Sequence, residues 1–344
     1  AMVVVARSLF RCCLASLSLS VLRVGGSAEP GSAGRSAAAA CAASEASSGL
    51  GLLQLDVARA GSAVRPGTRD LVLQHVPYNF GHTVEKIAAV GGGLHNMQKY
   101  VTLQGLESLE GVPKEVMWGT VNMLKRPNAE IWGHLNPDLS VRSNVTGCPM
   151  FFTPGKYWPE DLAQRYFGDR TIFGMLRDPY ERLVAMFRGN LGDYGGSYPE
   201  FFATCDVNGA VKKMMRDHLS GDIYAGECTF VPQAEYFDAP FGIALAVDNR
   251  RFPDSLNEVF AQHGYADFAI AKEDILHVTG CPDVWAGDLD CEAKALVKQV
   301  YARDFELLCQ KFGYCDDSEN TCIEGVPGMC PSRLEEKRRS ATKC

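Results

Sequence analysis

The amino-acid sequence predicts an α/β fold, in which a doubly wound, mainly parallel sheet is flanked by helices. Three apolar stretches typical of buried strands support this prediction, at residues 71–76, 170–179 and 241–247. Segments with helical spacing follow them, and strands that alternate with helices favour a parallel sheet. A length of 344 residues, with 46% hydrophobic and 22% charged residues, suits one large domain of this class or two small ones.

The other elements are assigned from the spacing of apolar residues along the chain. A helix is expected directly after the first strand, where Val84, Ile87 and Ala88 repeat at helical spacing. The later segments are predicted as a short strand over 129–135, helices over 159–166, 180–188, 207–219 and 255–263, and one long helix over 292–312. The tail after residue 314 is predicted to be an irregular, disulfide-held extension, with residues 333–344 disordered.

The N-terminus resembles a secretory leader. Arg7 and Arg11 precede a short apolar stretch and then small residues, the order found in signal peptides. We predict a signal peptide or signal anchor over 1–28, a flexible Ala/Gly/Ser-rich stem over 29–64, a folded domain over 65–314 and a cysteine-containing extension over 315–344. An organelle transit peptide is the alternative for the first segment.

Cysteine usage favours an oxidising compartment. The chain has 13 cysteines and no CxxC pair, so disulfides are favoured over a zinc site. The favoured bridges are Cys205 with Cys228 and Cys281 with Cys291, because each pair brackets a short segment, although spacing does not fix connectivity. Buried free thiols are the alternative for several cysteines. The sequon at Asn144 is a candidate glycosylation site on the same route. The net charge of -7 argues against a nucleic-acid partner.

Two predicted strand ends carry the groups that suggest a function. The turn Pro77–Thr83 joins the first strand to a helix, an arrangement that often binds a phosphate-like anion. The second strand ends in Arg177, and arginine binds phosphate groups in a bidentate manner. Because ligands of open α/β sheets bind beyond the carboxyl ends of the strands, the two ends together predict a nucleotide site. Asp178 and Glu181 fit a helix capping box better than a catalytic pair.

Four segments resemble, in order, motifs of the sulfotransferases that use 3'-phosphoadenosine 5'-phosphosulfate (PAPS), specifically the Golgi carbohydrate branch. The segment "HVPYNFGHTVE" stands where that branch has a pattern like H-I-P-K-T-G-G-T-S-x-E, and "RDPYERLVA" where it has one like R-D-P-x-E-R-x-x-S. Pro232, Gln233 and Tyr236 are similar to a later element of the family, and "ALAVDNRRF" with "ARDFELLCQKFGY" is similar to its final strand and helix. The resemblance covers residues 70–314.

The resemblance implies in-line transfer of a sulfuryl group from PAPS, a co-substrate, to a hydroxyl group of a carbohydrate acceptor, without a metal ion. It implies a Golgi lumen location, with the N-terminus as a candidate membrane anchor. His134 in "WGHL" would be the base, Arg177 would bind the 3'-phosphate, and Gln233 would help to shape the acceptor cleft. The positions that would contact the nucleotide are Tyr78, Asn79, Phe80, Gly81, His82, Thr83 and Ala185.

Three positions depart from the family pattern. Tyr78 replaces the loop lysine, Phe80 replaces a glycine, and Ala185 replaces the serine that contacts the 3'-phosphate. Losing such a charged donor usually lowers the rate ~100- to 1000-fold. Lys86, as a catalytic candidate that reaches back from the helix, and His82 are the possible replacements. The alternative is a catalytically impaired protein of this fold that acts as a binding or scaffold protein. A P-loop kinase is a third alternative, disfavoured because no GxxxxGK[ST] motif is present. The sequence does not define an oligomeric state.

Overall fold

The sheet consists of three parallel strands in the order β1-β2-β3. The structure is a computed structural model that describes residues 68–91, 128–189, 198–276, 280–316, 322–326, 328–341 and 343–344. The strands are β1 (Leu71–Leu73), β2 (Thr171–Leu176) and β3 (Leu245–Asp248). The first two lie inside their predicted segments, and β3 starts later than predicted and ends one residue beyond its segment. Leu71 pairs with Thr171, and Phe173 pairs with Leu245. The mixed α/β class is therefore confirmed.

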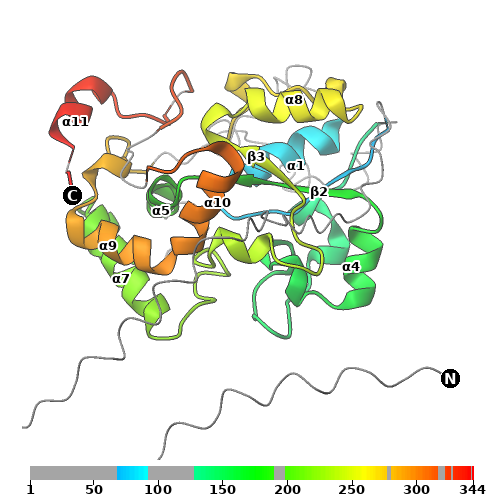
Figure 1. The fold of residues 1–344 in the computed structure, drawn as a ribbon, viewed down its shortest axis with the longest axis horizontal. Helices are drawn as coiled ribbons and strands as arrows, with labels where there is room; N and C mark the ends of the chain where they lie inside the picture. The colour runs from blue at the N-terminus through cyan, green and yellow to red at the C-terminus, as the bar shows by residue number, and fades with distance from the viewer. Residues whose placement is uncertain are drawn as a thin grey trace, which may run out of the picture. The chain divides into compact units, whose positions relative to one another are not determined.

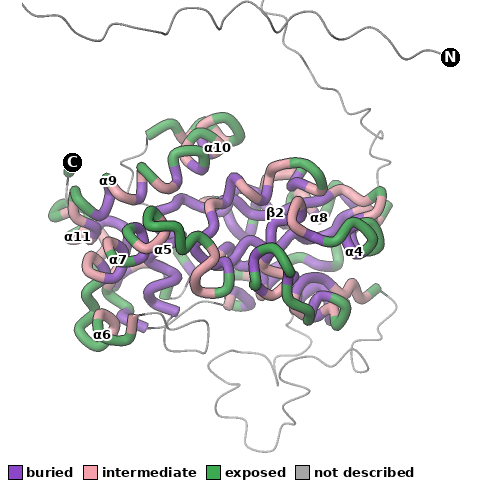
Figure 2. Tube along the Cα trace, turned by 90° about the horizontal axis from the view of Figure 1, so that it is seen from below, coloured by how far each residue is buried: buried purple, intermediate pink, exposed green. Residues whose placement is uncertain are grey.

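Helices lie on both sides of this sheet (Figure 1). In that view α1 (Gly81–Val90) and α8 (Asp254–Gln262) lie above the strands, and α4 (Glu160–Tyr166) lies below them. Apolar side chains of all three helices join one core with the strands, among them Val84, Ile87, Leu162, Ala163, Leu256 and Phe260. Figure 2 shows the strands buried at the centre and the exposed residues on the outside. Burial on both faces explains why the strand sequences are continuously apolar rather than alternating.

A second group of helices packs around α5 (Pro179–Arg188), every residue of which is buried. Its partners include α7 (Val207–Leu219) and α9 (Cys291–Val300), which share a second apolar cluster with it. Asp178 accepts hydrogen bonds from the N–H groups of Tyr180 and Glu181, so its predicted role as an N-cap is confirmed. The remaining helices are α6 (Pro199–Phe202), α10 (Ala302–Phe312) and α11 (Leu334–Ser340), and 3-10 turns include Gly133–Leu135, Gln233–Tyr236 and Asn249–Arg251.

Three predicted elements were wrong. The segment 129–135 is not a strand, because Gly133 takes a left-handed φ of 52° and starts a 3-10 turn. The predicted long helix over 292–312 divides at Tyr301, whose backbone leaves the helical conformation with a φ of -108° and a ψ of 26°. The Tyr301 hydroxyl donates to the Phe230 carbonyl at 2.9 Å. The C-terminal segment contains helix α11 rather than being disordered, and its last residue is held by a disulfide.

Five disulfides link the ten cysteines that follow residue 140, which confirms the use of cysteine for bridges. Their partners differ from the predicted ones: the pairs are Cys148–Cys228, Cys205–Cys281, Cys291–Cys344, Cys309–Cys315 and Cys322–Cys330. The first two join residues 80 and 76 positions apart, because the fold brings together segments that sequence proximity does not. Five bridges indicate an extracellular or secretory-pathway protein.

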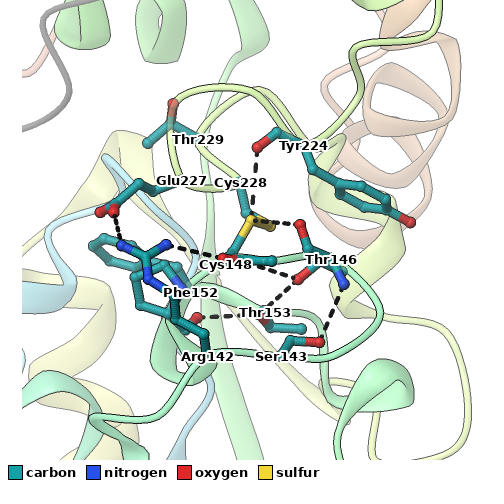
Figure 3. Close-up of a disulfide and its surroundings, with 12 residues drawn as sticks. Arg142, Ser143, Thr146, Cys148, Phe152, Thr153, Tyr224, Glu227, Cys228 and Thr229 are labelled. Atoms are coloured by element: carbon teal, nitrogen blue, oxygen red, sulfur yellow. Dashed lines mark hydrogen bonds and ion pairs between the residues drawn. A yellow bond between two sulfur atoms is a disulfide. The ribbon is translucent and has the colours of Figure 1, made fainter.

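Polar contacts surround the bridge between Cys148 and Cys228 (Figure 3). Arg142 Nη2 donates to Glu227 Oε1 at 2.6 Å, and the Thr146 and Thr153 hydroxyl oxygens lie 3.3 Å apart. The predicted glycosylation site, Asn144, is exposed in the same turn. Its modification stays a prediction, and the turn presents the side chain to solvent as the modification requires.

The described residues all fall within one structural unit, Gly61–Cys344. The predicted leader and stem, residues 1–64, lie outside the described residues. Among the helices described, none combines the length and the apolar character needed to cross a membrane.

Candidate functional site

A buried amide network joins the carboxyl ends of β1 and β2. Asn79 Nδ2 donates to the Met175 carbonyl at 2.7 Å and to Gln233 Oε1 at 2.6 Å. Gln233 Oε1 also accepts the N–H of Arg177 at 3.0 Å, and Gln233 Nε2 donates to the Arg177 carbonyl at 2.7 Å. Both amide side chains have an exposure of 0%. These two predicted site residues therefore fix the strand ends relative to each other, rather than facing solvent.

The loop between β1 and α1 has an unusual backbone. Tyr78 and Phe80 adopt left-handed φ values of 64° and 62°. A bulky residue in this conformation costs on the order of 1–3 kcal/mol, and such strain is concentrated at functional sites. Phe80 stands where the pattern that this segment resembles has a glycine, and its ring stacks on Phe252 with centroids 4.6 Å apart. The loop thus keeps a backbone conformation suited to glycine although a phenylalanine occupies the position.

Arg177 connects the end of β2 to this loop. Its Nη1 donates to the Tyr78 carbonyl at 2.7 Å, and its Nε lies 3.4 Å from Glu181 Oε2. The side chain is only 4% exposed. The predicted phosphate-binding arginine therefore lies beside the predicted anion loop, with part of its donor capacity used inside the protein. Ala185 lies two turns along α5 and is buried.

Thr83, a predicted nucleotide ligand, and Arg182, from the segment "RDPYERLVA", both make contacts inside the protein. Thr83 has an exposure of 0%, and its Oγ1 accepts the N–H of Leu276 at 3.0 Å. Arg182 donates from its guanidinium group to three carbonyl oxygens, those of Pro77, Thr229 and Val231. These contacts fix the loop from both sides, which gives Arg182 a structural role.

Three histidines converge on one buried carboxylate beside the loop. His75 Nδ1 lies 2.6 Å from Glu85 Oε1, and His82 Nδ1 lies 3.0 Å from Glu85 Oε2. His134 contacts Glu85 twice, through its Nδ1 to Oε2 and through its backbone N–H to Oε1 at 3.0 Å. The side chains of Glu85 and His75 are buried, whereas those of His82 and His134 are 26% and 14% exposed. This His-Glu cluster is thus closed on one side and reached by solvent on the other.

Two glycines make room for the His-Glu cluster. A Cβ on Gly133 would lie 1.6 Å from Glu85 Oε1, and a Cβ on Gly81 would lie 2.4 Å from His75 Nε2. Neither distance is physically possible for a side chain that stays in place. The cluster therefore depends on glycine at both positions, one in the 3-10 turn and one at the start of α1.

The surroundings of the cluster shift the pKa values of its members. Burial, aided by His134, lowers the pKa of His82 to about 3. The pKa of Glu85 is held well below its usual range, because the nearby histidines outweigh the burial that opposes ionisation. Burial also lowers the pKa of Lys86, the next residue on α1. At neutral pH, His82 is therefore a neutral hydrogen-bonding group, so it does not supply the positive charge considered for it in the sequence analysis.

The end of β3 brings a further cation to the same edge of the sheet. Arg250 Nη2 lies 3.7 Å from Asp178 Oδ2, and its guanidinium carbon lies 3.9 Å above the centroid of the Tyr314 ring. Burial raises the pKa of Asp178 to about 7, with Arg250 opposing the shift. Arg177 and Arg250 thus follow two neighbouring parallel strands, and both lie near the capped start of α5.

Sequence reasoning did not identify Glu85 as a functional residue and treated His75 as structural. Two signals were present in the sequence: His82 and Glu85 are three residues apart on a helix, which places them on one face, and His134 follows a glycine. The convergence of His75 and His134 on the same carboxylate depends on tertiary structure.

Comparisons with known proteins identify no relative. No protein-family model matches the chain, and searches of curated proteins and of solved structures find no significant match. The residues and geometry of this chain are therefore the basis for a functional assignment.

Proposed function

We propose that this protein is a PAPS-dependent sulfotransferase, which transfers a sulfuryl group to a hydroxyl group of a carbohydrate acceptor in the Golgi lumen. The observation that carries the proposal is the pairing of His134 with Glu85 next to the anion loop. The proposal includes the doubly wound sulfotransferase fold, and the sheet of three parallel strands supports this part of it.

The pairing suits general-base catalysis. With its Nδ1–H donated to an ionised carboxylate, His134 keeps a lone pair on Nε2, and the carboxylate stabilises the imidazolium that forms when this atom takes a proton. The backbone N–H of His134, bonded to Glu85 at 3.0 Å, fixes the position of the residue. A base held in this way can remove the proton of an acceptor hydroxyl group as the sulfuryl group is transferred.

The strand ends supply the complementary nucleotide site. Helix α1 begins at Gly81, directly after the loop, and has no acidic residue in its first turn to compete with an anion. Arg177 and Arg250 follow β2 and β3, so two arginines accompany the helix terminus at one edge of the sheet. A nucleotide with phosphate groups at both its 3' and 5' positions would offer two anionic groups to these positive groups.

A radiolabel transfer assay tests the proposal. The protein is incubated with chelator and PAPS that carries labelled sulfur, in the presence of a panel of glycosaminoglycan and glycan acceptors. We expect labelled carbohydrate, with transfer lowered by about 100-fold or more in His134→Asn, because general-base groups contribute about 10²- to 10⁴-fold. His218→Gln changes a histidine outside the His-Glu cluster and is the matched control, with unchanged transfer expected. Absence of label in every acceptor, from a chain that binds the product 3'-phosphoadenosine 5'-phosphate, would refute the transferase assignment.

A binding or scaffold role on the same fold is the second candidate, and a specific observation favours it. Arg177 and Thr83, two of the predicted nucleotide ligands, already make contacts inside the protein. Calorimetry with 3'-phosphoadenosine 5'-phosphate, with ADP as control, separates the candidates at the binding step. Micromolar binding that exceeds ADP binding supports the enzyme, whereas no binding at millimolar ligand supports the scaffold role.

A further inference from the structure

We infer that His75, His82, His134 and Glu85 form a binding site for one transition-metal ion of the zinc class. Their four ligand atoms, three imidazole nitrogens and one carboxylate oxygen, all lie within 4.8 Å of one another. This inference goes beyond the proposed transferase function, for which the sequence resemblance implies no metal ion.

The donor atoms have the chemistry and nearly the spacing that a zinc ion requires. Zinc binds histidine nitrogen and carboxylate oxygen at about 2.0–2.2 Å, which places the donors of a tetrahedral site roughly 3.4 Å apart. The His82 and His134 Nδ1 atoms are 3.0 Å apart, and His75 Nδ1 is 2.6 Å from the Glu85 carboxylate. To accept an ion, the closest donors therefore need to separate and the farthest, which lie up to 4.8 Å apart, need to approach, in each case by roughly 1–1.5 Å.

Three contacts meet at the centre of the cluster, and when both nitrogens donate to Glu85 Oε2, hydrogen bonds explain two of them but not the contact between the nitrogens. His82 Nδ1, His134 Nδ1 and Glu85 Oε2 are in mutual contact. The ionised carboxylate only accepts, and each ring nitrogen either donates or accepts. If both nitrogens carry a hydrogen, the contact between them has no acceptor. If one lacks a hydrogen, its lone pair faces the carboxylate. A cation between the three atoms makes all three contacts favourable, because each atom then offers it a lone pair.

The protein around the cluster favours a preformed site. His75 is held against Gly81 and Glu85 against Gly133, two positions where a Cβ would displace the ligand. His82 and Glu85 are one helical turn apart on α1, so a rigid element carries half of the donor set. His82 and His134 are partly exposed, which gives an ion and a bound water access from solvent. Three imidazoles with one carboxylate suit zinc, copper or iron rather than magnesium or calcium.

Metal binding would alter the proposed catalysis, a consequence that rests on the proposed function. An ion bound to Nδ1 of His134 requires the lone pair of that atom, so the imidazole proton moves to Nε2. The metal-bound protein then has no base on Nε2. The same side chains would thus have two exclusive states, a metal-free form with a general base and a metal-bound form without one.

The test is direct metal binding by the full chain, with its disulfides intact and without a polyhistidine tag. After treatment with chelator and its removal, the protein is titrated with Zn²⁺ by calorimetry and with Co²⁺ by visible absorption. We expect one equivalent of each, and a Co²⁺ spectrum of the low-symmetry type that imidazole and carboxylate ligands give. His82→Ala is expected to weaken Zn²⁺ binding by at least about tenfold, since loss of even an outer-sphere partner costs about 10- to 100-fold.

His218→Gln is the matched control, since it removes an imidazole outside the cluster, and its Zn²⁺ affinity should equal that of the unmodified chain. Near-ultraviolet circular dichroism shows whether each variant is folded. The inference is overturned if the folded chain binds neither Zn²⁺ nor Co²⁺, or if folded His82→Ala binds both as tightly as the control. The transferase proposal is judged separately, from labelled transfer in the presence of chelator, so metal binding without transfer refutes only that proposal.

Discussion

Replacing Gly133 with alanine should disrupt the His-Glu cluster without changing any of its members. The new Cβ would lie 1.6 Å from Glu85 Oε1 and 2.6 Å from its carboxyl carbon, so the carboxylate has to move away from His75 and from the His134 N–H. The left-handed φ of 52° adds a backbone cost of about 1–2 kcal/mol. Breaking the contacts of a buried charge costs about 3–5 kcal/mol. We expect the free energy of unfolding to fall by roughly 4–7 kcal/mol in total.

Gly147→Ala provides the matched comparison. Gly147 also has a left-handed φ, of 74°, but a Cβ there would meet no atom within 4 Å. Its substitution should therefore show the backbone cost alone, about 1–2 kcal/mol. Urea unfolding of both variants at neutral pH, in the presence of chelator, measures the difference. Equal losses of stability in the two variants would show that the Glu85 carboxylate does not lie against Gly133.

Three further predictions follow from other parts of the structure. Asp178→Asn keeps an N-cap acceptor but removes a carboxyl group whose pKa is raised to about 7 by burial. The unmodified chain should therefore lose stability relative to the variant as the pH rises from about 4 to about 7. A stability difference that is the same at pH 5 and pH 8 would contradict this. Gln233→Ala removes the hydrogen-bond partner of the buried Arg177 N–H and one of the two acceptors of Asn79 Nδ2. It should lower the free energy of unfolding by roughly 2–4 kcal/mol in urea, with the exposed Gln164→Ala as control. Replacing both cysteines of Cys148–Cys228 by serine should lower the free energy of unfolding by about 4–5 kcal/mol, and replacing both of Cys322–Cys330 by only about 2–3 kcal/mol. The difference arises because the first bridge closes the longer loop. The opposite order in the same assay would refute the chain-entropy reasoning.

Sequence patterns predicted the local elements of the fold well where burial and periodicity agree. The strand before Arg177 and the helix Val207–Leu219 were placed almost to the residue, because a continuous apolar run and a clear helical stripe mark them. The segment 129–135 was predicted as a strand since most of its residues are apolar. Its conformation is instead set by Gly133, which has to leave space for a carboxylate that is 48 residues earlier in the chain.

The candidate site was predicted in its parts but not in its organisation. The loop, Arg177 and His134 were each identified, and the structure places all three at one edge of the sheet. The role of Glu85 was missed because its spacing from His82, the one local signal, does not show that two further histidines meet at its carboxylate. Gln233 was expected at an acceptor cleft, and only tertiary contacts reveal that both of its amide atoms are used between the strand ends.

The pattern of disulfides also determines how the chain responds to proteolysis. Cys205 lies within the loop closed by Cys148–Cys228, and Cys228 lies within the loop closed by Cys205–Cys281, so the two loops overlap. A single peptide bond cut anywhere from residue 148 to residue 281 therefore leaves one covalent molecule, and the same holds between Cys291 and Cys344. Nicked and intact protein would then migrate together on a gel until a reductant separates the fragments.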